Sequence, residues 1–270
     1  MAVSPTPTTH TNSLHSLYSL YCLREVDVSF CGLNQFPVAI GCLRQLERLN
    51  LGGNNFVSLP SLNELSNLVY LNLKHCMFLE SLPQLPFPAA MNWDLIPSNN
   101  FLCNIGLDIF NCPKLDERGC IMAFSWMTQF IQENQQFSGE IDIVIPRNEI
   151  PSWFNNQSEG DRILIDNSSI KYDIKNDIIG FVCCSVFSME PIDPISTPMV
   201  CSISTKLNLN GKVNKLVSKD RGNYLSVFGD LITVKTNHIW LTYFPRKLSW
   251  YVPDFQGAMD VKFDYVLSLL

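Results

Sequence analysis

Apolar residues recur at a fixed spacing in the first third of the chain. The pattern leucine, two residues, apolar, one residue, apolar starts at Leu23, again at Leu46 and again at Leu68. The two intervals between these starts are nearly equal. Alternating inward apolar and outward polar side chains are typical of a short strand, so each copy predicts one strand of a stacked repeat.

Both intervals lie in the range of leucine-rich repeats, about 20–29 residues, whose units bury their apolar faces only against their neighbours. Residues 23–117 are therefore expected to form the end of an α/β leucine-rich-repeat solenoid, after a polar tail at residues 1–22. In each copy one position, Cys31, Asn54 or Cys76, is expected to turn the chain and to bond backbone groups at the bend. Because three repeats are near the lower limit for independent stability, we expect the chain to be the tail of a longer solenoid.

The outward residues of stacked repeat strands are the usual contact surface of such proteins, because they line one continuous face. Arg48 and Tyr70 are the strongest candidates on this face, since arginine and tyrosine are enriched among the residues that dominate binding energy. The expected partner-binding residues are Glu25, Asp27, Arg48, Asn50, Tyr70, Asn72, Lys74 and His75.

A helical pattern follows the repeats. The apolar residues of this segment fall on one stripe of a helix, and we expect a connecting helix over residues 118–138 that packs this stripe against the end of the repeats. The stripe consists of Ile121, Phe124, Met127, Phe130 and Ile131.

From residue 139 onward, short runs of β-branched and aromatic residues alternate with turn residues. Several short strands without intervening helices predict an all-β sandwich or a similar antiparallel fold over residues 139–270. The loop at residues 212–223 is a further candidate for partner contact. The expected strands cover residues 141–145, 163–165, 178–187, 200–209, 225–234 and 238–244.

Charge and hydropathy narrow the choice of partners. The net charge of −6 argues against a nucleic-acid binder, whose affinity depends on lysine and arginine contacts with phosphates. The longest apolar run, residues 178–187, is half the length needed to cross a bilayer, and the N-terminal residues do not resemble a signal peptide. We expect a cytoplasmic or nucleo-cytoplasmic protein that binds another protein, with neither nucleic acid nor membrane as a partner.

Motifs of catalysis and metal binding are absent from the sequence. It has no phosphate-binding loop, no dinucleotide-binding glycine motif, no serine-hydrolase elbow, no H-E-x-x-H and no C-x-x-C. His238 with Cys183 or Cys184 is a conceivable nucleophile–base pair, but both cysteines lie in an apolar strand where a thiol is buried and unreactive. We therefore expect no enzyme activity, no catalytic residues, no cofactor and no metal site.

Residues 144–157 read V-I-P-R-N-E-I-P-S-W-F-N-N-Q. This segment resembles the block I-P-G-x-E-I-P-x-W-F-x-x-Q that opens the domain after the repeats in plant TIR-NBS-LRR disease-resistance receptors. Residues 110–115, 179–188 and 237–244 resemble other parts of the same region, so the resemblance runs from about residue 23 to residue 263. Arg147 stands where these receptors have glycine.

We interpret the block mainly as structural. Its prolines stiffen the connection, and Trp153 and Phe154 are expected to pin the loop onto the sandwich by burying their rings. The residues of this structural motif are Pro146, Glu149, Ile150, Pro151, Trp153 and Phe154.

The resemblance implies a jelly-roll or immunoglobulin-like β-sandwich that works beside the repeats in sensing pathogen effectors. The implied partner is a protein: a pathogen effector, a guarded host protein or another domain of the receptor. In the family, effector contact leads to nucleotide exchange, oligomerisation and cleavage of NAD⁺ by the TIR domain. The sequence contains neither the TIR domain nor the nucleotide-binding domain, so these activities are not attributed to it. Residues 261–270 are expected to lack the closing strand of the family.

Three alternatives remain open at the level of the sequence. A carbohydrate-binding sandwich would need an exposed aromatic cluster such as Trp240, Trp250 and Tyr251. A hydrolase would need a reactive cysteine of low pKa. A non-functional receptor fragment would be indicated by insoluble expression.

Overall fold

The structure is a computed structural model that divides the chain into two compact units, Met1–Asn134 and Gln135–Leu270. We refer to them as the repeat unit and the β-rich unit. The described residues are 22–86, 105–134, 141–154, 157, 162–165, 180–187, 199–209, 212–214, 237–245 and 257–267.

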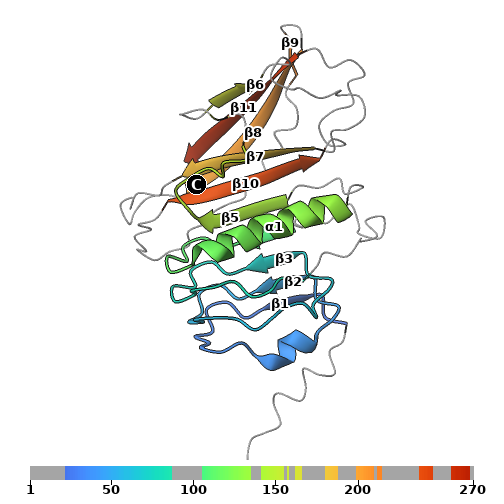
Figure 1. Cartoon of the computed structure of the whole chain (residues 1–270), viewed down its shortest axis with the longest axis vertical. Coiled ribbons are helices and arrows are strands. Elements are labelled where there is room, and N and C mark those ends of the chain that lie inside the picture. The colour runs from blue at the N-terminus through green and yellow to red at the C-terminus, as the bar shows by residue number, and fades with distance from the viewer. Residues whose placement is uncertain are drawn as a thin grey trace, which may run out of the picture. The chain divides into compact units, whose positions relative to one another are not determined.

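Four short parallel strands form the sheet of the repeat unit. In order across the sheet they are β1 (Glu25–Asp27), β2 (Arg48–Asn50), β3 (Tyr70–Asn72) and β4 (Ile105–Asp108). Strands β1 to β3 are stacked in chain order (Figure 1). The three predicted repeat strands are therefore present, and β4 adds a fourth strand to them.

One leucine each of β2, β3 and β4 lies in the core of the repeat unit. Leu49, Leu71 and Leu107 are register partners along the sheet and are at most 3% exposed. A column of leucines at this spacing lets each repeat cover the apolar side of the next one. The 3₁₀ helix η2 (Val38–Cys42) adds Ala39 and Ile40 to the same core.

The helix α1 (Glu117–Glu133) lies where a helix over residues 118–138 was predicted, but it begins one residue earlier and ends at Glu133. The side chain of Asp116 accepts a hydrogen bond of 2.8 Å from the backbone N–H of Gly119, which satisfies one of the free donors at the helix start. At the other end, the backbone N–H and the side-chain amide of Asn134 both donate to the carbonyl of Phe130.

The buried stripe of α1 differs from the expected one. Phe124, Met127 and Phe130 are buried as predicted, but Ile121 is 55% exposed. Trp126 is buried instead and packs against Phe130, with ring centroids 5.4 Å apart. The prediction failed at Ile121 because the spacing of apolar residues allows a wider stripe than the one that the core covers.

The β-rich unit contains two antiparallel sheets. In the first, β10 (His238–Pro245) lies between β5 (Ile141–Pro146) and β7 (Gly180–Phe187). In the second, the order is β6 (Arg162–Ile165), β11 (Gly257–Leu267), β8 (Met199–Leu209) and β9 (Lys212–Asn214) (Figure 1). The β-rich, antiparallel character predicted for residues 139–270 is confirmed.

The strand β11 corrects one expectation. Residues 261–270 were expected to lack a closing strand, but β11 runs to Leu267 and pairs with both β6 and β8. Its sequence alternates apolar residues with Asp260, Lys262 and Asp264, which is the period of a strand. The same sheet corrects the expected loop at residues 212–223, because Lys212–Asn214 is strand β9. The expected strand at residues 225–234 lies outside the described residues.

A carboxylate joins two strands of the first sheet. Asp142 on β5 accepts hydrogen bonds at one oxygen, Oδ1, from Trp240 Nε1 at 2.9 Å and from Thr242 Oγ1 at 2.8 Å. Both donors belong to β10 and are only 3% exposed. The carboxylate therefore satisfies two polar groups that burial would otherwise leave without a hydrogen bond.

Candidate functional site

The outward side chains of the repeat strands form two rows that follow the strand register. The first row contains the first outward residues of β1, β2 and β3. The second row contains the last residue of each of the four strands. The first row is Glu25, Arg48 and Tyr70, and the second row is Asp27, Asn50, Asn72 and Asp108.

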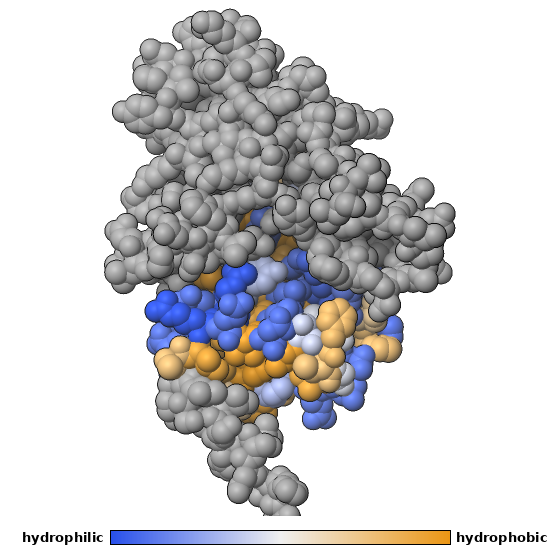
Figure 2. Space-filling view, turned by 180° about the vertical axis from the view of Figure 1, so that it is seen from behind, coloured by the Kyte–Doolittle hydropathy of each residue, from blue (hydrophilic) through white to orange (hydrophobic). Residues whose placement is uncertain are grey.

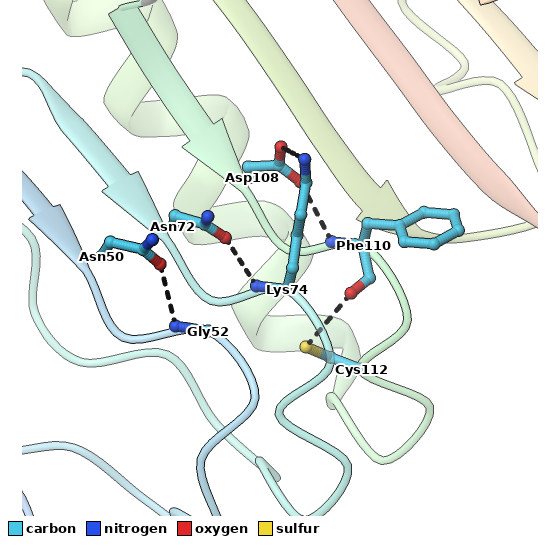
Figure 3. Close-up of polar contacts among 7 residues, drawn as sticks. All are labelled: Asn50, Gly52, Asn72, Lys74, Asp108, Phe110 and Cys112. Carbon is cyan, nitrogen blue, oxygen red and sulfur yellow. Dashed lines mark hydrogen bonds and ion pairs between the residues drawn. The ribbon is translucent and has the colours of Figure 1, made fainter. Parts of the chain in front are cut away.

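Every residue of the second row caps the turn that follows its own strand. Its side-chain oxygen accepts a hydrogen bond from the backbone N–H two residues further on, an arrangement typical of aspartate and asparagine in turns. Figure 3 shows three of the four turns, those after β2, β3 and β4. The donors are Ser29 at 2.9 Å, Gly52 at 3.1 Å, Lys74 at 2.9 Å and Phe110 at 3.4 Å.

The residue after each of these donors has a left-handed backbone. The φ angles are 53° at Phe30, 66° at Gly53, 59° at His75 and 56° at Asn111. Only one of these positions is glycine, and it is required there, because a Cβ on Gly53 would lie 2.3 Å from the ring of Phe30. A left-handed conformation at Phe30 and His75 is unfavourable, so the capped turns and the neighbouring repeats must hold it in place.

One further residue along, a buried polar side chain ties each repeat to the one before. Asn54 is 1% exposed, donates to the carbonyls of Val28 and Leu51, and accepts from the N–H of Leu33. In the next repeats the thiols of Cys76 and Cys112 donate to the carbonyls of Leu51 and Leu73 at 3.5 and 3.0 Å. The predicted bonding of backbone groups at the bend is confirmed for Asn54 and Cys76, and also for Cys31, whose thiol donates to the carbonyl of Ser29 in its own turn.

The charges of the second row are used within the protein. Lys74 Nζ lies 2.8 Å from Asp108 Oδ2, and both side chains are mostly buried. Asp27 accepts from the N–H and hydroxyl of Ser29 and from the amide of Asn50. Burial raises the pKa of Asp27, but these hydrogen bonds outweigh it and lower the pKa overall.

His75 is part of the turns and belongs to an aromatic cluster. Its Nδ1 lies 3.0 Å from the side-chain amide of Asn111, and its ring meets that of Phe110 edge to face at 5.7 Å. Burial, followed by the nearby positive charge of Lys74, lowers the pKa of His75, while Asp108 has the opposite effect. The imidazole is therefore neutral at pH 7.

The first row is arranged differently. The guanidinium carbon of Arg48 lies over the ring of Tyr70, 4.4 Å from its centroid, which is the geometry of a cation–π contact. Arg48 Nε lies 4.0 Å from Glu25 Oε1, a distance too long for a hydrogen bond. The side chain of Glu25 is 72% exposed and that of Arg48 is 21% exposed. This row presents an acid, a base and an aromatic ring side by side.

The two-row face is polar and aromatic rather than apolar. In the described part of the repeat unit, the exposed large apolar side chains lie outside β1 to β4. Figure 2 shows hydrophobic side chains of the repeat unit gathered in a band between hydrophilic ones on the face that it presents. Among the described residues of the repeat unit, the exposed large apolar side chains are Phe30, Val38, Val57, Met77, Phe78 and Ile121.

The structure brings together all eight residues expected on the repeat face, and it adds some that the sequence did not indicate. Asp108, Phe110 and Cys112 continue the second row, the aromatic cluster and the buried donor position into β4. They were missed because β4 follows β3 after a longer stretch of chain than the one that separates the earlier strands. The aspartate–x–aromatic–Asn–Cys order of residues 108–112 was the available signal.

The proline and aromatic motif of the β-rich unit is placed only partly as expected. Pro146 ends β5, Pro151 is buried, and the loop is closed by a 3.1 Å hydrogen bond from the N–H of Phe154 to the carbonyl of Pro151. Glu149 is exposed and Ile150 is half-buried. The expected burial of Trp153 is wrong. Trp153 is 50% exposed, and its ring stacks on that of Phe154 with centroids 4.1 Å apart.

Arg147 takes the place of the family's glycine without a left-handed backbone. In the described residues, positive φ outside glycine occurs at Phe30, His75 and Asn111. The N–H of Arg147 donates to the carbonyl of Asn237 at 3.0 Å, which continues the pairing of β5 with β10. A side chain is therefore tolerated at this position.

The structure separates the residues considered for a hydrolase. In the register of β10 and β7, Cys184 pairs with Leu241 and Cys183 with Thr242, three and four residues from His238. Three residues of a strand span about 10 Å, which is too far for proton transfer between the imidazole and a thiol. Burial raises the pKa of Cys183 and of Cys184 to about 12, so neither thiol is a ready nucleophile.

The remaining expectations concern a sugar site, the cysteines, membrane helices and metal sites. Trp240, considered for a sugar site, is buried and bonded to Asp142, while Trp250 and Tyr251 lie outside the described residues. Cys22, Cys31 and Cys42 are exposed, whereas Cys76, Cys112 and Cys120 are buried. In the described part of the chain, no helix combines the length and hydrophobicity needed to cross a bilayer, and no group of three or more histidine, cysteine or acidic residues could hold a metal.

Comparison with known proteins finds similarity to disease-resistance proteins of plants. Residues 145–268 match the C-JID domain. The disease resistance-like protein DSC1 of Arabidopsis thaliana is 34% identical over 163 residues, which cover 51% of this chain and 13% of that protein. The TMV resistance protein N of Nicotiana glutinosa is 27% identical over 214 residues, covering 70% of this chain and 18% of that protein. The disease resistance protein RPS6 of Arabidopsis thaliana is 24% identical over 176 residues, covering 64% and 14%. The chain thus spans only a small part of the length of these relatives.

Proposed function

The chain is related to plant disease-resistance receptors of the TIR-NBS-LRR family and carries a C-JID domain, and on this premise we propose that it is a protein-recognition module in plant defence. The repeat strands are the last leucine-rich repeats of such a receptor, and the β-rich unit is a jelly-roll or immunoglobulin-like sandwich. The partner is a pathogen effector, a guarded host protein or another receptor domain. Since this receptor class acts inside the cell, the module works in the cytoplasm or in cytoplasm and nucleus.

The observation that carries the proposal is the outward face of the repeat sheet. Parallel strands in register place Glu25, Arg48 and Tyr70 in one row, and the turns behind this row are fixed by the capping side chains. A rigid scaffold that presents an arginine and a tyrosine is suited to protein recognition, because little entropy is lost when these side chains are held by a partner.

The proposal assigns no catalysis to this chain. The relatives are disease-resistance proteins by name. In this proposal, the nucleotide exchange and NAD⁺ cleavage that the family resemblance implies are assigned to receptor domains other than the repeats and the C-JID domain. In this proposal the chain binds the partner, and the receptor responds to this binding.

The test compares two pairs of substitutions in the 270-residue chain, using extract of pathogen-challenged plant tissue and identification of bound proteins by mass spectrometry. Changing Arg48 and Tyr70 to alanine is expected to abolish specific capture. The matched control changes Arg44 and Glu64 to alanine, because this ion pair, 3.0 Å apart with both side chains at least 70% exposed, lies outside the two rows. Equal capture by both variants would contradict recognition through the repeat face, as would the absence of any partner for the folded chain.

A further inference from the structure

The two carboxylates of the second row differ in their partners. Asp108 on β4 lies 2.8 Å from the ammonium group of Lys74. Asp27 on β1 accepts hydrogen bonds from the N–H and hydroxyl of Ser29 and from the side-chain amide of Asn50, and all three donors are uncharged. Among the described residues, no lysine or arginine forms an ion pair with Asp27. Since an aspartate is ionised at pH 7, Asp27 carries a negative charge that no described cation neutralises.

The carboxylate of Asp27 can accept one more hydrogen bond. An ionised carboxylate accepts about four, and Asp27 accepts three. The two bonds from Ser29 go to Oδ1, whereas Oδ2 accepts only the amide of Asn50. Asp27 is also exposed. A cation of another molecule can therefore bind Oδ2 while Oδ1 continues to cap the turn.

The turn after β1 presents an aromatic ring next to this carboxylate. Phe30 is 72% exposed, although its φ angle of 53° is unfavourable for a phenylalanine. Its N–H donates to the carbonyl of Gly52, and its ring packs against Gly53, where a Cβ would lie 2.3 Å from the ring. An exposed ring that the turn holds in place loses little entropy when a partner covers it. An unfavourable backbone that places an apolar ring in water points to a role in binding.

Asp27 and Phe30 contact the same neighbouring repeat. Asp27 is bonded to Asn50, and Phe30 packs on Gly53, three residues further along the chain. Three residues span about 10 Å at most. Lysine and arginine have a long apolar stem and a charged head, so one such side chain can lay its stem on the ring and direct its head to the carboxylate. A cation close to an aromatic ring is attracted to its face as well.

The charges around this position favour a cation from outside. The outward charged residues of β1, Glu25 and Asp27, are both acidic. On the facing strand, Arg48 lies 4.0 Å from Glu25 and forms no ion pair with Asp27. His75, whose ring centroid is 6.4 Å from that of Phe30, is neutral at pH 7 because burial lowers its pKa. The net charge of the whole chain is −6.

We infer that the protein partner supplies a lysine or arginine whose charged head binds Asp27 and whose stem packs on the ring of Phe30. The inference rests on the proposed function, and it specifies the chemistry of one contact beside the row of Glu25, Arg48 and Tyr70. Asp27 provides the charge and Phe30 the apolar surface. The capped turn between them fixes their relative positions.

The experiment uses peptides displayed on phage and selected on the immobilised 270-residue chain. Selected peptides are synthesised, each with counterparts in which one lysine or arginine is replaced by glutamine. Affinities for wild type, Asp27→Asn and Phe30→Leu are measured by fluorescence polarisation at low and at high salt. Because Asn50 and Asn72 cap equivalent turns through amide oxygens, Asp27→Asn removes the charge and keeps the cap. Hydrogen exchange of β1 to β3 verifies that each variant is folded.

Two matched controls lie away from the proposed contact. Glu64→Gln removes a carboxylate that is 70% exposed and paired with Arg44. Phe78→Leu removes another exposed ring, in the turn of the third repeat.

The expected result is a coupling between Asp27 and one basic residue of the peptide. Replacing that residue by glutamine weakens binding to wild type about tenfold, because a charge-assisted hydrogen bond is lost. Asp27→Asn weakens binding of the basic peptide by a similar factor and binds both peptides about equally, as a double-mutant cycle requires of a direct pair. Phe30→Leu weakens binding about threefold. Glu64→Gln and Phe78→Leu leave it unchanged, and high salt weakens binding to wild type more than to Asp27→Asn.

Two sets of results would overturn the inference, and they differ in what else they remove. If peptides require Arg48 and Tyr70 but show no coupling between Asp27 and a basic residue, or bind Phe30→Leu as well as wild type, the contact at Asp27 and Phe30 fails. The proposed recognition face then stands. If no peptide is selected, or if none depends on any outward residue of the repeat strands, both the inference and the proposed recognition face fail.

Discussion

The repeat unit and the β-rich unit hold their strands together in different ways. Strands β1 to β3 have three residues each, and each pairs with the strand of an adjacent repeat. Strands β8 and β11 have eleven residues each and pair along their whole length. Short strands make few ladder hydrogen bonds, so the repeat unit depends on side chains that bond the backbone at every turn. Long antiparallel strands supply those bonds themselves.

The polar side chains of the two units have different structural roles. In the repeat unit, Asn50, Asn72 and Asp108 occur on an apparently exposed face but serve the turns behind it. In the described part of the β-rich unit, the comparable case is Asp142, which bonds two buried side chains rather than the backbone. Fewer residues of a repeat face are therefore available to a partner than the number that point outward.

The largest effect is expected from Asn54→Ala. This change removes the hydrogen bonds of Asn54 to two carbonyls and one N–H, and only the carbonyl of Leu51 keeps another donor, the thiol of Cys76. We expect a loss of about 3 kcal/mol in the stability of the repeat unit. Hydrogen exchange of peptides covering β1 to β3, measured by mass spectrometry, reports it directly. Asn55→Ala at the exposed neighbouring position is the control and should change little. Protection that survives Asn54→Ala would show that the short strands do not need this side chain.

A smaller effect is expected from Asp142→Ala in the β-rich unit. The change leaves Trp240 and Thr242 without their acceptor, at a cost of about 2 kcal/mol, while the ladders from β10 to β5 and β7 remain. Asp142→Asn keeps an oxygen at the same position and should retain most of the stability. Urea unfolding followed by hydrogen exchange of β5 and β10 separates the two variants, and equal losses would contradict a hydrogen-bonding role.

The smallest effect concerns pH. Because the folded state lowers the pKa of His75 below 6.5, the unfolded chain binds the proton more readily, and stability falls as pH drops through and below 6.5. His75→Asn suits the left-handed backbone, as Asn111 does, and should reduce this loss between about pH 7.5 and 5.5. The lowered pKa of Asp27 changes stability only near and below pH 3.8, so Asp27 does not contribute to the change in stability between about pH 7.5 and 5.5. Identical pH profiles of wild type and variant, from hydrogen exchange of β3, would refute the assignment to His75.

Two wrong predictions of side-chain burial share one cause. A sequence pattern shows the periodicity of apolar residues but not which parts of the folded chain pack against them. The stripe of α1 included Ile121, which stays exposed, and omitted Trp126, which is buried. The rings of Trp153 and Phe154 were expected to be buried, yet they stack on each other and leave Trp153 half exposed. By contrast, β11 was missed although its alternating residues were visible, because the resemblance to a family was given more weight than the local pattern.

The sequence by itself determined the repeat strands, the buried leucines and the helix, because each depends on contacts that recur either within a few residues or once in every repeat. It also determined the relation to plant disease-resistance proteins, through the block at residues 144–157. Tertiary structure alone decided the pairing of β5 with β10, whose bonded residues Asp142 and Trp240 are 98 positions apart. It also decided which outward residues cap turns and which form the row of Glu25, Arg48 and Tyr70. The physical reason is that a hydrogen bond or a ring contact depends on distance and direction in space, which a linear pattern does not contain.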